Sequence, residues 1–148
     1  MISRRSMMAG TVALGLVGCT RQSPTYSGPQ VTRIQVLKER REMQLLHHRT
    51  LLRSYSIDLG FAPVGHKVQE GDGRTPEGGY RIDRRNPNSS FHLSLGISYP
   101  DAGDVAYARA KGVDPGGDIF IHGTPPIWER TPDWTWGCIA VTNDEMDE

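Results

Sequence analysis

The amino-acid sequence predicts a mainly β domain with one or two short helices. Its 148 residues suffice for one domain with a hydrophobic core, and its 17 glycines and 10 prolines suit many turns rather than a helical bundle. The segment FHLSLGISY, which begins at Phe91, alternates apolar and polar residues with the period of a half-buried strand. The segment GGDIFIHG, which ends at Gly123, contains the short apolar run of a buried strand.

Residues 1–18 predict a secretory signal peptide, in which Arg4 and Arg5 precede an apolar run too short to span a bilayer. The segment LVGC resembles a bacterial lipobox, which implies cleavage before Cys19 and lipidation of its thiol. An ordinary export signal is the alternative, and the export route, Sec or twin-arginine, stays open. Residues 19–30 then form a polar, lipidated tether. We expect an exported, periplasmic protein with a lipid anchor in the membrane.

The domain begins at Val31, where apolar residues at 31, 34 and 36 predict a first strand. Residues 38–52 are rich in helix formers and fit either a helix or a β-hairpin. We choose the hairpin, because pairs of leucines bracket a plausible turn. Its strands are Met43–Leu46 and Leu51–Leu59, with the turn near His47–Arg49.

The second half of the chain predicts a glycine-rich loop over 65–79, two strands and two helix signals. One strand starts at Tyr80–Asp83. In the next strand, Phe91, Leu93, Leu95 and Ile97 form an apolar face, and His92, Ser94 and Ser98 form a polar face. Asp104–Lys111 predicts a short helix that ends at Gly112. TNDEMDE begins another helix, with Thr142 or Asn143 as its cap.

The charge and the histidine spacing exclude several functions. Lys+Arg and Asp+Glu are both 17, so the net charge of zero argues against a nucleic-acid binder. His47, His48 and His66 have no metal-like spacing with cysteine or acid, and we expect neither a metal nor a cofactor. We place His47 and His48 in a turn and expect His92 to be solvated. The domain is expected to be a monomer.

The two cysteines have different expected roles. If Cys19 carries a lipid, Cys138 in the segment WTWGCIAV has no disulfide partner. An unpaired cysteine in an exported protein is either a reactive thiol or a small buried residue.

Four segments now occur in a fixed order: GDGRTPEGGYRI, FHLSLGISYPDAGD, GGDIFIHG and WTWGCIAVTN. Together they resemble the YkuD-type L,D-transpeptidase catalytic domain, most closely its YafK-like branch. The resemblance covers residues 31–148 and implies a β-sandwich or barrel-like sheet. Family members usually continue beyond the last helix, so the resemblance also implies that the end of the domain is missing.

The family pattern carries over to a catalytic pair. Cys138 matches the nucleophile, and His122, sixteen positions earlier, matches the base that activates it. Gly123 matches the residue whose backbone carbonyl orients the imidazole. A thiol needs such a base because only its thiolate attacks a carbonyl.

Of the four positions 135, 136, 137 and 140, two match the family pattern and two depart from it. Gly137 and the hydroxyl residue Thr135 fit the pattern, and the N–H groups of Gly137 and Cys138 are candidate oxyanion donors. Trp136 replaces a histidine found in many members, and Ala140 replaces an arginine, which removes a plausible carboxylate contact. Trp136 is a candidate substrate contact, although we interpret Trp134 and Trp136 mainly as packing at the rim, with sugar stacking as the alternative.

The glycine-rich loop has two interpretations. A phosphate cradle would need a Lys-Ser/Thr pair at the right spacing, which the loop lacks. We therefore assign Asp72, Thr75 and Gly78 to a structural turn that borders the cleft.

The resemblance implies a peptidoglycan L,D-transpeptidase. Its acyl transfer through a Cys138 thioester on stem peptides would form 3-3 cross-links or attach an acceptor amine. Two alternatives stay open. One is a hydrolase, an L,D-carboxypeptidase or an amidase that releases a wall-anchored lipoprotein. The other is a catalytically idle lipoprotein that binds the wall.

Overall fold

A computed structural model describes residues 26–148. The signal peptide, the lipidation of Cys19 and the first part of the tether lie outside the described residues and stay predictions. Within residues 26–148, no helix combines the length and the apolar character needed to cross a membrane.

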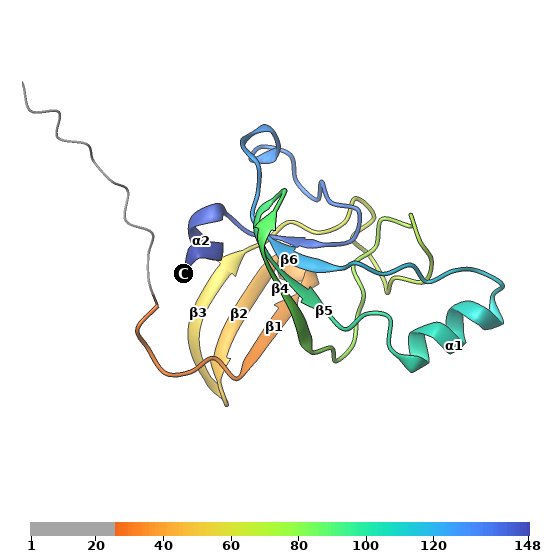
Figure 1. Cartoon of the computed structure of the whole chain (residues 1–148), viewed down its shortest axis with the longest axis horizontal. Coiled ribbons are helices and arrows are strands. Elements are labelled where there is room, and N and C mark those ends of the chain that lie inside the picture. Colours follow the sequence, from red (N-terminus) through yellow and green to blue (C-terminus); the bar gives the residue numbers. More distant parts are fainter. Residues whose placement is uncertain (1–25) are drawn as a thin grey trace, which may run out of the picture.

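Two β-sheets form the domain (Figure 1). The first is an antiparallel sheet of three strands, β1 (Arg33–Leu37), β2 (Glu42–His47) and β3 (Thr50–Ser56). The second has the order β4 (Ile82–Ser89), β5 (His92–Ile97), β6 (Phe120–His122) and β7 (Ile139–Ala140). Its last pair, β6 and β7, is parallel and its other pairs are antiparallel. The prediction of a mainly β fold is confirmed.

The predicted hairpin is confirmed as β2 and β3, although the second strand ends at Ser56 instead of Leu59. The helix-forming residues before it make only a 3-10 helix, η1 (Lys38–Arg40), which ends at Arg41 with φ +50°. Met43 of β2 and Tyr55 of β3 are 4% and 8% exposed, so the hairpin places both side chains in the core. Packing of that kind overrides local helix propensity.

The core lies between the two sheets and draws on both. Its buried members are Met43, Tyr55, Ile57, Leu59, Ile121, Ile139 and Val141. Burying an aliphatic side chain of this size contributes about 1.5–3 kcal/mol. An antiparallel bridge from Asp58 to Ala140 joins the two sheets along one side. On the other side, a groove of about 1060 Å³ runs between β1 and β4. The two sheets are therefore joined along one side and open along the other, as in an incompletely closed barrel.

Strand β5 departs from the predicted half-buried pattern. It begins at His92, so Phe91 lies in the preceding turn instead of on the apolar face. On the face predicted to be solvated, Ser94 is only 5% exposed. His92, on the same face, is exposed as predicted, and its Nε2 lies 2.6 Å from Asp147 Oδ1 of a helix that packs against β5.

The two short helices agree with the sequence signals. Helix α1 (Ala102–Ala110) begins two residues before the predicted start, because Asp101 caps it in a capping box with Asp104. Helix α2 (Asn143–Asp147) is capped by Thr142. The two helices lie at opposite ends of the domain (Figure 1).

Candidate active site

The parallel strands β6 and β7 bring the two predicted catalytic residues to one face. Ile121 pairs with Ile139, and both side chains enter the core. His122 pairs with Ala140, so both lie on the opposite face, because side chains alternate along a strand. Cys138 lies two residues before Ala140, outside the two-residue strand, and strand alternation predicts the same face for it. Strand spacing and rise place the Cα atoms of His122 and Cys138 roughly 8 Å apart.

His122 is held in one orientation by its backbone neighbour. Its Nδ1 lies 2.7 Å from the Gly123 carbonyl oxygen. A carbonyl only accepts hydrogen bonds, so Nδ1 carries the proton and Nε2 of the neutral ring has a free lone pair. The contact predicted for the Gly123 carbonyl is present.

Aromatic rings enclose the imidazole, which is 3% exposed. Phe91 stacks on it with ring centroids 4.7 Å apart, and Trp134 meets it edge-on at 5.5 Å. Burial lowers the pKa of His122, although the hydrogen bond to Gly123 partly opposes this shift. At neutral pH the ring is therefore neutral and can accept a proton.

Gly123 leaves no room for a side chain. An added Cβ would collide with Asn143 Oδ1 and lie 3.0 Å from the Phe91 carbonyl oxygen. The Gly123 N–H also donates to that carbonyl at 3.0 Å. This close packing fixes the turn that carries the carbonyl acceptor of His122.

The thiol of Cys138 lies against the start of β6. Its Sγ is 3.4 Å from the backbone nitrogen of Phe120 and 3.7 Å from the carbonyl oxygen of Asp118. Burial raises the pKa of Cys138, while the Phe120 N–H and the charge of Lys67 oppose this shift. Among the hydrogen bonds within residues 26–148, none joins this thiol to the His122 ring. Because its pKa is raised, the free thiol of Cys138 is protonated at neutral pH.

The turn before the nucleophile depends on Gly137 and Thr135. Gly137 has φ +128°, and an added Cβ would lie 2.6 Å from the Arg74 carbonyl oxygen. Thr135 is 2% exposed, and its hydroxyl donates to the Cys138 carbonyl at 2.8 Å and accepts from the Gly137 N–H at 3.2 Å. Thr135 thus braces the turn. Because the Gly137 N–H is engaged, the Cys138 N–H is the better placed of the two predicted oxyanion donors.

Lys67 is a feature of the site that the sequence did not reveal. Although it lies in an open-looking glycine-rich loop, it is 3% exposed. Its Nζ donates to Asp72 Oδ1 and to the Gln69 carbonyl oxygen, each at 3.0 Å. Asp72 also accepts the backbone N–H groups of Val68, Gln69 and Arg74, and these bonds keep its pKa low despite its burial. The trace of this pair in the sequence, a lysine five residues before an aspartate, does not by itself indicate burial.

The contacts of Asp72, Arg74 and Thr75 agree with the interpretation of the glycine-rich loop as a structural turn. Thr75 is 1% exposed and accepts the Gly60 N–H at 3.2 Å. The Arg74 carbonyl lies against Gly137, so the loop borders the nucleophile.

The two tryptophans beside Cys138 have opposite settings. Trp134 is packed between His122, Phe91 and Trp128, and its ring is parallel to that of Trp128 at 5.5 Å. Its Nε1 is buried and has no hydrogen-bond partner among the described residues. Trp136, in contrast, is 72% exposed and contacts only the edge of Phe61 among the described rings. Rim packing therefore describes Trp134 but does not describe Trp136.

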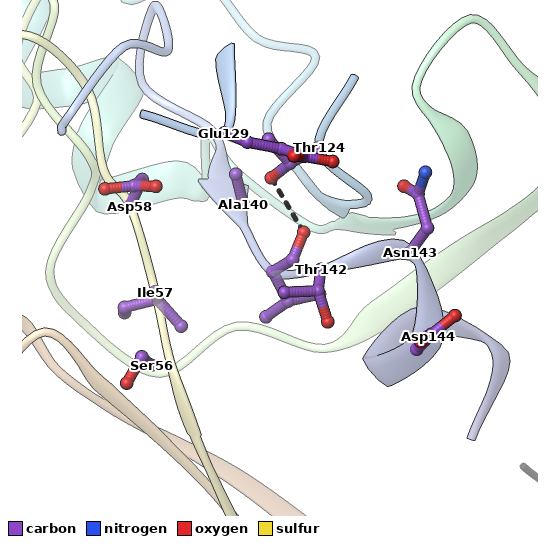
Figure 2. Close-up of a pocket in the computed structure, with 10 residues that line it drawn as sticks. Ser56, Ile57, Asp58, Thr124, Glu129, Ala140, Thr142, Asn143 and Asp144 are labelled. Atoms are coloured by element: carbon purple, nitrogen blue, oxygen red, sulfur yellow. Dashed lines mark hydrogen bonds between the residues drawn. The ribbon is translucent and has the colours of Figure 1, made fainter. Parts of the chain in front are cut away.

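A pocket of about 600 Å³ lies beyond the histidine, between the end of β3 and the start of α2 (Figure 2). Acidic residues in it are Asp58, Glu129 and Asp144. The Thr124 hydroxyl at its wall donates to the Val141 carbonyl at 2.8 Å. Neither Cys138 nor His122 lines this pocket, so the thiol lies outside it. Within residues 26–148, no group of His, Cys, Asp and Glu side chains is arranged to hold a metal ion.

Comparison with known proteins agrees with this geometry. Residues 31–148 match the family model described as YkuD, the L,D-transpeptidase catalytic domain. The chain is 33% identical over 132 residues to YafK of Escherichia coli strain K12, a protein provisionally named as an L,D-transpeptidase. The same values hold for YafK of strain O157:H7.

One solved structure also resembles the domain. Bd1075 of Bdellovibrio bacteriovorus has a TM-score of 0.54 and 26% sequence identity, over 76% of this chain and 40% of that chain. The YafK matches cover 85% of this chain and 46% of each relative. The chain thus spans about half the length of the curated relatives it matches.

Proposed function

Because the chain belongs to the family of YkuD L,D-transpeptidase catalytic domains, we propose that it transfers acyl groups in cell-wall peptidoglycan, with Cys138 as nucleophile and His122 as base. The observation that carries this proposal is the orientation of His122. Its Nδ1–H is bound to the Gly123 carbonyl, which leaves Nε2 as the acceptor, and Cys138 lies two residues before Ala140, the strand partner of His122. Export and lipid anchoring through Cys19 belong to the same proposal.

In the first half-reaction, His122 Nε2 takes the proton of the Cys138 thiol. The thiolate attacks the carbonyl carbon on the L-centre of the stem-peptide diamino acid, and the Cys138 N–H stabilises the resulting oxyanion. The C–N bond to the terminal D-residue then breaks, and the leaving amine takes the proton from His122. A thioester to Cys138 remains.

In the second half-reaction, an acceptor attacks the thioester and gives a proton to His122. The C–S bond breaks, and the thiolate is released and reprotonated. An amine acceptor gives a cross-link or an attached protein, and water gives hydrolysis. The raised pKa of Cys138 makes the base necessary, since few thiolates form without it at neutral pH.

Labelling with imipenem tests the nucleophile. We expect one covalent adduct per folded chain, located on Cys138 by peptide mass spectrometry and lost in Cys138→Ala. A folded protein that forms no adduct, or an adduct on another residue, would contradict the assignment.

Digestion of purified muropeptides, followed by mass spectrometry, then identifies the acceptor. Products joined between two diamino acids indicate 3-3 cross-linking. Shortened stems or released protein indicate hydrolysis. If muropeptides bind but are recovered unchanged, the domain is a wall-binding module and the transferase proposal fails.

A further inference from the structure

Two aromatic side chains stand out from the surface on the outer side of the nucleophile turn. Trp136 is 72% exposed and Phe61 is 51% exposed. Their ring centroids are 5.1 Å apart, and the ring planes meet at 84°. Large exposed apolar groups in contact with one another mark interaction sites more often than isolated ones do.

The backbone beneath these rings is tightly connected. The Phe61 N–H donates to the Thr135 carbonyl at 3.0 Å, and Gly60 forms a parallel bridge with Thr135. The Phe61 ring lies on Gly73, where an added Cβ would collide with it and where φ is +66°. The Ala62 N–H donates to the Gly73 carbonyl at 3.0 Å. The backbone at Gly60–Ala62 and the Phe61 ring are therefore held by the local fold and need little further ordering when a ligand binds.

We propose that Trp136 and Phe61 form a stacking platform for a sugar ring of the glycan strand whose stem peptide is presented to Cys138. This inference rests on the proposed function and specifies which part of the substrate the outer side of the site contacts. Trp136 is two residues from the nucleophile, so a sugar on its ring lies within one stem peptide of the thiol.

The chemistry around the platform favours a sugar over a wholly apolar ligand. A pyranose has an apolar C–H face and a hydroxyl rim, and the electron-rich face of an indole attracts polarised C–H groups. Two rings at a right angle offer one face for stacking and one edge for lateral contact. Arg74 is exposed, its backbone carbonyl adjoins Gly137, and it directly follows Gly73 under the Phe61 ring, so this segment carries a guanidinium with hydrogen-bond donors.

The test compares two substrates: a disaccharide-tetrapeptide muropeptide and the same tetrapeptide without sugars. The measured quantity is the ratio of kcat/KM for the first to kcat/KM for the second. We expect Trp136→Ala and Phe61→Ala each to lower this ratio by about tenfold, the effect of losing roughly 1.4 kcal/mol of stacking. Trp136→Phe should recover part of the loss. The control is Tyr107→Ala, which removes a 50% exposed aromatic ring from a separate element, α1, and should keep the ratio of the unchanged protein.

A second measurement does not depend on turnover. Cys138→Ala protein is titrated with N-acetylglucosamine tetramer, and tryptophan fluorescence reports binding. Saturable quenching that Trp136→Phe removes supports the platform, even if the chain proves not to be a transferase. Failure of the proposed function would instead appear as unchanged muropeptide turnover in Cys138→Ala.

Three results would overturn the inference. The first is an unchanged substrate ratio in both aromatic variants. The second is the absence of quenching by the sugar. The third is that Trp136→Ala loses binding to phosphatidylglycerol vesicles while its substrate ratio is unchanged, which would assign the rings to a membrane surface.

Discussion

The turn before Cys138 carries a tryptophan on each side, and the two differ in burial: Trp134 on the inner side is packed, and Trp136 on the outer side is exposed. On the inner side, Trp134 is packed against His122, Phe91 and Trp128. On the outer side, Trp136 is 72% exposed and meets only the edge of Phe61. Alternation along an extended segment would send residues 134 and 136 the same way, but residues 136 and 137 lie in a bend, where Gly137 has φ +128°. Trp134 thus packs against the ring of His122, and Trp136 is the tryptophan for which a ligand is proposed.

The largest expected effect is on the inner side, at the base itself. His122→Ala should lower the rate of imipenem acylation by about 10²-fold or more, because it removes the proton acceptor of the thiol. Stopped-flow or mass-spectrometric acylation rates measure this. His122→Gln, which keeps a polar side chain without a basic nitrogen, should be equally slow. A rate equal to that of the unchanged protein would reassign the base.

Trp134→Ala tests whether the inner tryptophan supports the fold. We expect the free energy of unfolding to fall by about 3 kcal/mol, because the ring packs against three other rings. Urea denaturation measures this loss. Trp134→Phe is the matched control and should cost less than half as much, since it keeps an aromatic ring and removes an indole N–H that has no partner among the described residues. A stability unaffected by Trp134→Ala would remove the distinction between the two sides.

The enclosed histidine predicts a particular pH dependence. Burial lowers the pKa of His122 below its ordinary value of about 6.5, so the neutral base persists to that pH or lower. Protonation of His122 should therefore leave the acylation rate nearly constant between about pH 7.5 and 6.5. Once the pH is below the pKa of His122, the rate should fall about tenfold per pH unit, because the base is then protonated. The unfolded state binds this proton more tightly, so the free energy of unfolding should also decrease below about pH 6.5. An acid limb with its midpoint above pH 7 would contradict the enclosed setting of the ring.

The smallest effect is expected on the outer side. Trp136→Ala should change the free energy of unfolding by no more than about 0.5 kcal/mol, as exposed substitutions usually do. Urea denaturation beside Trp134→Ala gives the direct contrast. A loss as large as that of Trp134→Ala would show that Trp136 is a packing residue, and the platform would lose its basis.

Much of this arrangement could be predicted from the sequence because local signals carry it. The hairpin, α1, the cap of α2 and the strand ending at His122 depend on short patterns, and each is present. Strand β7 could not be predicted, since a pair such as Ile139–Ala140 is too short to show a period. The enclosure of His122 depends on Phe91, a residue expected in a strand, which the turn before β5 swings over the imidazole.

The burial of the charged side chain of Lys67 also could not be predicted from the sequence. Lys67 lies among glycines and polar residues, a context that normally indicates solvent exposure. Its burial depends on Asp72, which gathers three backbone N–H groups together with the ammonium. Trp136 likewise has its ring contact with Phe61, which lies seventy-five residues earlier in the sequence. Contacts of such sequence separation leave no periodic trace.

The parallel pairing of β6 and β7 has a consequence for how this domain can diversify. His122 ends one strand and Cys138 directly precedes its neighbour, so the sheet register fixes the position of both, whatever the length of the chain that connects them. Doubling the length of a flexible loop costs only about 0.6 kcal/mol in closure entropy. Insertions at the exposed residues Glu129 and Arg130 should therefore be tolerated, provided that Asp133 keeps its paired hydrogen bonds to Arg41 at 2.8 and 2.7 Å. The connection is a place where new substrate contacts can evolve while the reaction chemistry stays the same.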